Sequence, residues 1–119
     1  MKQNKIIEAY KALNNLCSDK LPLKAAFSIY KMKKTLEDNY KFQLDKEREF
    51  MDECNGFIDS EGRVTFSNKE DAAKFMDKIK ELNDIDSNIE IVPVLISLDS
   101  ELSITPKDVE ALDGFIHFE

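Results

Sequence analysis

Apolar residues recur every three or four positions along the first half of the chain, which is the pattern of amphipathic helices. In the first such segment, residues 4–16, the apolar stripe consists of Ile6, Tyr10 and Leu13, and it continues to Cys17. The polar residues that follow break the pattern. The spacing therefore predicts a short helix over residues 4–16.

A second, much longer pattern begins at Pro22, a residue that suits the first position of a helix because it has no N–H to leave unpaired. It predicts one helix over residues 22–54, closed by Gly56 in a left-handed conformation. The second half is narrower, and we expect it either to project from the domain or to break into two. The predicted inward stripe comprises Ala26, Ile29, Lys33, Leu36, Tyr40, Leu44, Glu47, Met51 and Cys54, widened in the first half by Leu23, Phe27 and Tyr30.

The second half of the chain alternates short extended runs with helical patterns. Two runs, 57–58 and 64–66, flank a turn in which Gly62 supplies a positive φ, and they predict a hairpin. Ser67 and Glu70 fit a capping box that opens a helix over residues 68–82. Its predicted inward residues are Ala72, Phe75, Met76, Ile79 and Leu82.

The last elements are a strand and a short helix. The run "IEIVPVLISL" at 89–98 predicts a strand near 89–96 that lies at a sheet edge or is interrupted at Pro93, which cannot donate to a ladder. Thr105 caps a helix with Pro106 at its first position, and Gly114 ends it. Phe115, Ile116 and Phe118 are then expected to pack back onto the core.

These patterns predict a single α+β domain over residues 1–119. It is mostly helical, with one long central helix packed with two shorter helices plus a small antiparallel hairpin or sheet. A composition of 42% hydrophobic and 34% charged residues argues against a disordered chain. No apolar run approaches the roughly 20 residues of a membrane span, and the first residues lack a secretory signal. We therefore expect a cytoplasmic protein without membrane contact.

Candidate chemistry is sparse. The three glycines are assigned to structure, and no phosphate-binding or nucleophile-elbow motif occurs. Cys17, Cys54 and His117 are isolated and have no metal-ligand spacing. The loop Asp84–Asn88 imitates the start of a calcium loop but has Ile89 where glycine is required, so it is expected to be a turn. We predict no catalytic, cofactor-binding or metal-binding residues and expect the protein not to be an enzyme.

The net charge of −7 is unevenly spread. Residues 1–50 hold 11 basic and 7 acidic side chains, a net charge of +4, whereas residues 51–119 hold 6 basic and 17 acidic side chains, a net charge of −11. Lysines of the long helix alternate with acidic residues on one outer face, so that face is expected to neutralise itself. This face comprises Lys31, Lys34, Asp38, Lys41, Asp45, Arg48 and Asp52.

The acidic half leaves many charges unbalanced, and we predict that it binds a protein partner, such as a basic nucleic-acid-binding surface. Plain solubility is the competing explanation. Direct binding of nucleic acid is not expected, because the field would repel it. The predicted partner-binding residues are Asp59, Glu61, Glu70, Asp71, Asp77, Glu81, Asp84 and Asp86.

The segment "KLPLKAAFSIYKMKKTLEDNYKF" at 20–42 resembles the opening motif of a small phage and prophage family, domain of unknown function 1617. The turn at 59–62, the strand at 88–91 and "LSITPKDVEALDGFI" at 102–116 are also similar to it. The resemblance covers residues 12–118, with a shorter middle and with Asp38-Asn39 where the family often has Glu. It implies a phage or prophage protein of a Firmicutes-type host and supplies no catalytic residues.

Three functions are compatible with these features. The first is a phage-encoded protein that binds and inhibits a host protein, such as a defence nuclease, as anti-CRISPR proteins do. The second is a virion morphogenesis factor, such as a tail-assembly chaperone, which suits the long helix. The third, an uncharacterised enzyme, fits least. The oligomeric state is left open, with a homodimer through the long helix as one arrangement.

Overall fold

The computed structural model of the protein describes residues 1–16, 21–97 and 104–119. It confirms the predicted fold class, a mostly helical α+β chain built around one long helix. Its elements, in chain order, are α1 (Gln3–Leu16), α2 (Leu23–Glu53), β1 (Phe57–Ile58), β2 (Val64–Thr65), α3 (Lys69–Asn83), β3 (Val94–Ile96), α4 (Pro106–Ala111) and β4 (Ile116–Phe118).

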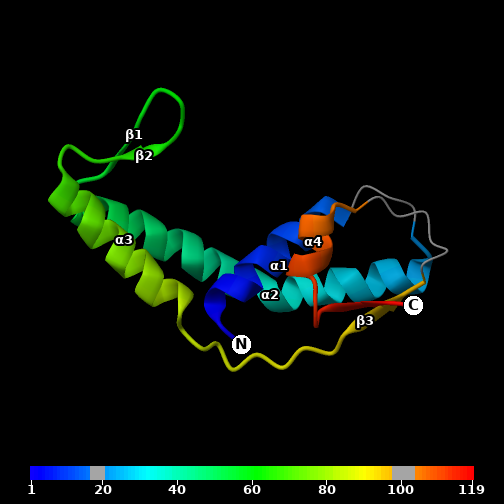
Figure 1. Cartoon of the computed structure of the whole chain (residues 1–119). Coiled ribbons are helices and arrows are strands. Elements are labelled where there is room, and N and C mark those ends of the chain that lie inside the picture. Colours follow the sequence, from blue (N-terminus) through cyan, green and yellow to red (C-terminus); the bar gives the residue numbers. More distant parts are fainter. Residues whose placement is uncertain (17–20, 98–103) are drawn as a thin grey trace.

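The long helix α2 is unbroken and sets the shape of the molecule. Its 31 residues correspond to a length of about 46 Å, and the molecule measures 51 × 33 × 21 Å. Figure 1 shows α1, β3, α4 and β4 gathered along the first half of α2, while α3 and the hairpin lie along the second half. Of the two alternatives for the second half, projection is therefore correct and a break is not.

The main core lies between α1, the first half of α2, β3, α4 and β4. Phe115, Ile6 and Leu36 are its largest fully buried side chains, together with Leu13, Leu16, Ile96 and Leu112. The prediction that Phe115 and Ile116 pack back onto the core is confirmed. As predicted, the hydroxyl of Thr105 accepts a hydrogen bond from the N–H of Asp108 and caps α4.

Strands β3 and β4 pair in parallel, with Val94 opposite Ile116 and Ile96 opposite Phe118. The sequence predicted a strand over 89–96, but residues 89–93 form no ladder. Pro93 has no N–H to donate, so regular pairing starts only after it. Of the two alternatives for this strand, interruption at Pro93 is therefore the correct one.

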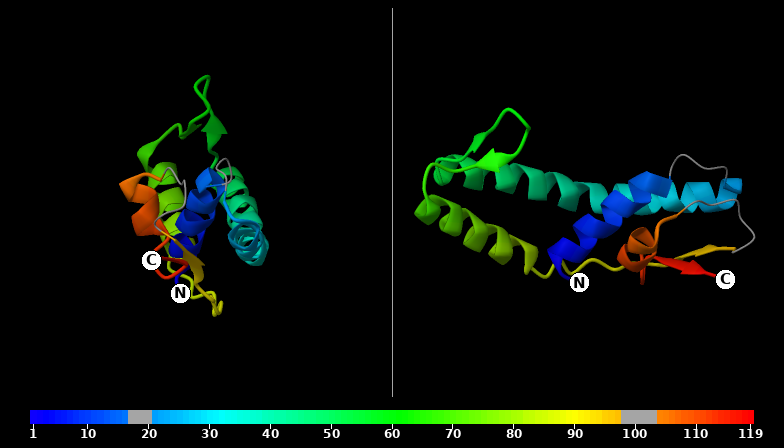
Figure 2. Two further views of the ribbon diagram at one scale, coloured as in Figure 1. Left: turned by 90° about the vertical axis from the view of Figure 1, so that its right-hand side faces the viewer. Right: turned by 45° about the horizontal axis from the view of Figure 1, so that its top comes forward.

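We call the second half of α2 from residue 42, the β1–β2 hairpin and α3 the arm. Only Gln43, Cys54 and Leu82 are buried among its described residues. The aromatic rings of Phe66 and Phe75 pack at a centroid distance of 5.0 Å. The prediction that α3 belongs to a common helical core is therefore wrong, because α3 lies along α2 beyond the residues of the main core (Figure 2).

Two end signals in the arm lie one residue from their predicted positions. Asn68, not Ser67, caps α3, and its side-chain oxygen accepts the N–H of Asp71 at 2.8 Å. Asn55, not Gly56, takes the left-handed conformation after α2, with φ 58°. Gly56 is needed for a different reason, because a Cβ atom there would lie 2.7 Å from Met51 Cγ and from Phe66 Cε1.

A buried polar junction joins the core to the arm. The side chain of Gln3, 2% exposed, donates to the carbonyl of Asn39 at 2.8 Å and accepts from the Ser87 hydroxyl at 2.9 Å. Further along α2, Gln43 donates through Nε2 to Asn83 at 3.0 Å. The Oε1 atom of Gln43 is buried without a hydrogen-bond partner, which makes this junction costly to maintain.

Candidate protein-binding surfaces

The first two predicted partner-binding carboxylates lie in the hairpin, where they hold the turn. Asp59 accepts hydrogen bonds from the N–H groups of Glu61 and Arg63, both at 2.9 Å. These backbone donors, led by Arg63, hold the pKa of Asp59 below its usual value. Arg63 also forms ion pairs with Asp59, at 3.6 Å, and with Glu61. A partner would therefore meet these carboxylates already engaged.

Four more of these carboxylates lie on α3. Asp71 belongs to the N-terminal cap, where it accepts a hydrogen bond from Asn68 Nδ2 at 3.1 Å. Glu70, Asp77 and Glu81 follow one another at helical spacing on the exposed side of the helix. None of these three forms an ion pair with another residue in the described part of the chain. They are the carboxylates most open to a partner.

The last two carboxylates follow α3 and bind the start of the chain. Asp86 accepts a hydrogen bond from the N-terminal amine of Met1 at 2.9 Å, and this bond lowers the pKa of Asp86. Asp84 lies 3.6 Å from Lys2 Nζ. The structure thus divides the eight predicted carboxylates among the hairpin, α3 and this loop, and their role in partner binding stays a prediction.

The first turns of α2 carry a surface that the sequence analysis placed incorrectly. Leu23, Phe27 and Tyr30 were predicted to lie in the core, but their exposed fractions are 87%, 58% and 56%. At 3.6 residues per turn they project away from the side of α2 that buries Ile29, Met32 and Leu36. No described residue covers them. We call Leu23, Phe27 and Tyr30 the apolar face.

Lysines frame the apolar face. The ammonium group of Lys31 lies 5.6 Å from the centre of the Phe27 ring, and that of Lys34 lies 5.8 Å from the centre of the Tyr30 ring. The two rings are 6.5 Å apart. Lys34 also binds Glu37 at 3.3 Å; the hydrogen bond between them raises the pKa of Lys34 and lowers that of Glu37.

Further along the same side of α2, charges pair as expected, although with a different partner. Glu37 accepts both Lys34 and Lys41, the latter at 3.5 Å, whereas Asp38 was the expected neighbour. All seven residues of the predicted outer face are exposed. The prediction of a solvated face carrying ion pairs is therefore confirmed in kind, and the apolar face is its uncharged beginning.

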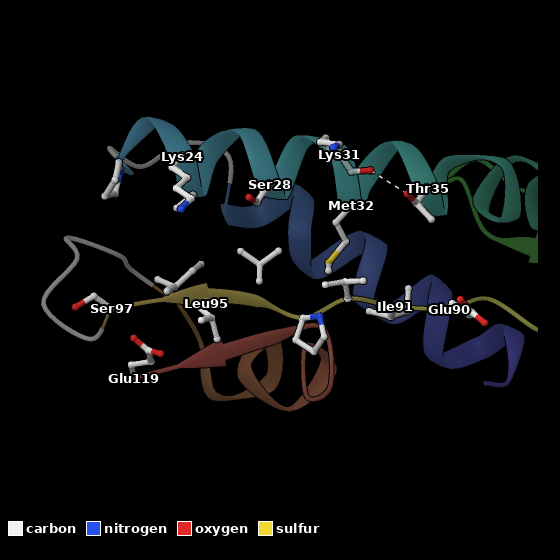
Figure 3. A pocket seen from close by; sticks show the side chains of 16 residues that line it. Lys24, Ser28, Lys31, Met32, Thr35, Glu90, Ile91, Leu95, Ser97 and Glu119 are labelled. Carbon is white, nitrogen blue, oxygen red and sulfur yellow. Dashed lines mark hydrogen bonds between the residues drawn. The ribbon is translucent and has the colours of Figure 1, made fainter.

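A groove of about 730 Å³ runs beside the apolar face, between α2 and the segment that leads into β3. Figure 3 shows Lys24, Ser28 and Lys31 along the α2 wall, opposite Leu95. Leu95 is 60% exposed, because its side chain points away from the core while Val94 and Ile96 point into it. The described lining includes no histidine or cysteine. The groove therefore offers contact surface rather than a reactive pair.

Other candidate chemistry is equally limited in the part of the chain that the structure describes. Cys54 is buried as a free thiol, and His117 is exposed on β4. Cys17 lies outside the described residues. Within residues 1–16, 21–97 and 104–119, no group of three or more His, Cys, Asp or Glu side chains is placed to hold a metal ion. None of the described helices has the length and apolarity needed to cross a membrane.

No protein-family model, curated protein or solved structure matches the chain. The resemblance to family 1617 accordingly stays a prediction. The surfaces described above are left to carry the functional argument.

Sequence reasoning had a signal that would have identified the apolar face. Leu23, Phe27 and Tyr30 follow the spacing i, i+4, i+7, and so do Ile29, Leu36 and their neighbours, but the two stripes lie on opposite sides of one helix. A small domain covers one side of its longest helix more easily than both. The two stripes were merged into one broad core surface, and that step caused the error.

Proposed function

We propose that this chain acts by binding a protein partner and that the apolar face supplies the central contact. The observation that carries the proposal is the exposure of Leu23, Phe27 and Tyr30 as one cluster on the solvent side of α2. Contiguous exposed apolar side chains are typical of interaction sites. Aromatic residues supply much of the binding energy where such sites are measured.

The surrounding charges support the same proposal by giving the contact a direction. Lys24, Lys31 and Lys34 border the apolar face, so a partner surface that carries carboxylates would be attracted to it. Glu70, Asp77 and Glu81 on α3 form a separate contact of opposite sign. We propose that this acidic surface attracts basic protein surfaces, including those that bind nucleic acid.

At the cellular level we propose the role implied by the resemblance to family 1617. The chain would be a phage or prophage protein in the host cytoplasm that occupies a host protein, such as a defence nuclease. Its acidic surface would compete there with nucleic acid for a basic site. This finer proposal depends on the resemblance, whereas binding through the apolar face depends on the exposed side chains.

The test is co-purification from host cells with the double variant Phe27→Ala/Tyr30→Ala. Both side chains are exposed, so we expect the fold to remain and the partner recovered by the unaltered protein to be lost. Lys41→Ala/Asp45→Ala, two exposed positions further along the same helix face, is the matched control and should retain the partner. Equal recovery with both double variants would contradict the proposal.

A second variant tests the acidic surface separately. Reversal of Glu70, Asp77 and Glu81 to lysine leaves the capping residue Asp71 intact. If the acidic surface attracts the partner, association should weaken most at low salt, where charges act over longer distances. An unchanged affinity at low and moderate salt would leave these carboxylates as a solvated surface only.

A virion assembly role is the second candidate, and the extended shape favours it. The radius of gyration is 17.0 Å, compared with about 13.5 Å for a compact domain of this length. Such a shape separates two surfaces far enough to bridge neighbouring molecules. Recovery of virion components rather than host proteins in the same co-purification would support this candidate.

A further inference from the structure

We propose that the partner of the apolar face includes a second copy of this chain, bound head to tail through the exposed side of α3. This inference rests on the proposed function, because it assigns a partner to the same face. The molecule exposes 8263 Å² of surface, whereas a compact chain of 13.7 kDa exposes about 6,600 Å². The excess of about 1,700 Å² matches two contacts of about 800 Å² each.

The side of α3 that faces away from α2 is complementary to the apolar face in charge. Its carboxylates Glu70, Asp77 and Glu81 line up along the helix without ion pairs to other described residues. Lys74 and Lys80 lie at the two borders of this row, yet the surrounding half of the chain is strongly acidic. The apolar face is bordered by Lys24, Lys31 and Lys34 instead. Two apolar faces would therefore repel each other, whereas an apolar face and α3 would attract.

The same side of α3 also offers apolar contact. Met76 is 61% exposed beside the acidic row, and the small side chain of Ala73, also exposed, lies one turn before it. The flexible side chain of Met adapts to aromatic rings, and sulfur–aromatic contacts are favourable. A copy that places Met76 on the rings of Phe27 and Tyr30 brings its carboxylates towards the lysines that border them. We call Met76, Glu70, Asp77 and Glu81 the acidic face.

The two faces cannot meet within one molecule, because they lie at opposite ends of α2 (Figure 1). The apolar face points away from the core, and the acidic face points away from α2 on the side where α3 packs (Figure 2). A two-fold pair would need both faces on the same side. The geometry therefore gives a head-to-tail contact in which every copy offers one face of each kind.

The experiment is sedimentation velocity on the unaltered chain at increasing concentration, in low salt and with a reductant that prevents cysteine cross-links. We expect the average mass to rise above that of the monomer and to fall again at high salt. A monomer at every concentration and both salt levels would overturn the proposal. Partner binding by the apolar face in the co-purification test would still stand in that case.

Two variants and their mixture decide whether the contact is head to tail. Phe27→Asp/Tyr30→Asp removes the apolar face, and Glu70→Lys/Asp77→Lys/Glu81→Lys removes the acidic face, so each alone should associate at least about tenfold more weakly. An equimolar mixture should form a one-to-one dimer and stop there, because each variant retains the face that the other lacks. Association of either variant alone at the unaltered strength would overturn the proposal, as would a mixture that stays monomeric. Helical circular dichroism of each variant verifies that it is folded.

Discussion

The two ends of α2 solve the same packing problem with different completeness. At the first end, α1, β3, α4 and β4 surround the helix and bury side chains such as Leu36 and Phe115 completely. In the arm, one helix and a hairpin cover only part of it, and Cys54 and Leu82 are the buried apolar residues among those described. One continuous helix thus belongs to a well-packed region and to a thinly packed one. The difference implies that the arm opens at lower free energy than the core.

The largest expected effect comes from the packed end. Replacement of Phe115 by alanine should lower the free energy of unfolding by about 3–5 kcal/mol, because it empties a fully enclosed site. Urea denaturation followed by circular dichroism measures it. The comparison is Phe75→Ala in the arm, which should cost clearly less because Phe75 is only half-buried. Equal losses would remove the distinction between the two regions.

The next effect is confined to the arm. A methyl group introduced by Gly56→Ala would overlap Met51 and Phe66, so we expect a loss of about 1–3 kcal/mol from overpacking. Hydrogen exchange should show faster opening of α3 and the hairpin, with α1 unchanged. Gly62→Ala is the control, because nothing lies within 4 Å of a Cβ atom there. Its strain, which arises from φ +80°, should affect only the turn.

The junction between the two regions should give a smaller effect. In the variant Gln43→Met, the hydrogen bonds to Asn83 and Glu47 are lost, but so is the unpartnered Oε1 atom. The net cost should be about 1 kcal/mol. We expect α3 to exchange its amide hydrogens more independently of α1 than in the unaltered protein. No change in the exchange of α3 would show that Gln43 does not couple the regions.

The smallest effect concerns pH and the hairpin. The folded state holds the pKa of Asp59 below its usual value. Its contribution is therefore present above the ordinary carboxyl pKa of about 4 and is lost as pH falls through the lower folded value. NMR signals of the Glu61 and Arg63 amides should shift over that acidic range, while those of α1 stay constant. In Asp59→Asn the dependence should disappear.

Sequence patterns predicted the elements well because they depend on local rules. The ends of α1 and α2 agree with their predicted positions to within one residue, since proline and the periodicity mark them. The cap at Thr105 was also predictable, because one side chain and a proline define it. Errors of one residue at Ser67 and Gly56 arose where Asn68 and Asn55 compete for the same role.

Patterns did not predict which surfaces would be covered. Leu23, Phe27 and Tyr30 resemble core residues in any local window, and their exposure depends on where β3, α4 and β4 pack. The parallel pairing of Val94 with Ile116 joins segments that no local rule relates. The acidic candidates were chosen by charge alone. Their ion pairs at Asp59, Asp84 and Asp86 depend on the three-dimensional arrangement.

The parallel strand pair also determines when the protein can fold during synthesis. Helix α1 is made first, yet it is covered by Leu112, Phe115 and Ile116, which are made last. The hydrogen bond from Asn15 to Asp108 spans 93 residues of sequence. Contacts of such long range slow folding, so α1 and α2 must wait on the ribosome with their apolar sides uncovered. A nascent chain stopped before α4 should therefore depend on chaperones, whereas the arm, whose contacts connect nearer segments, can form earlier.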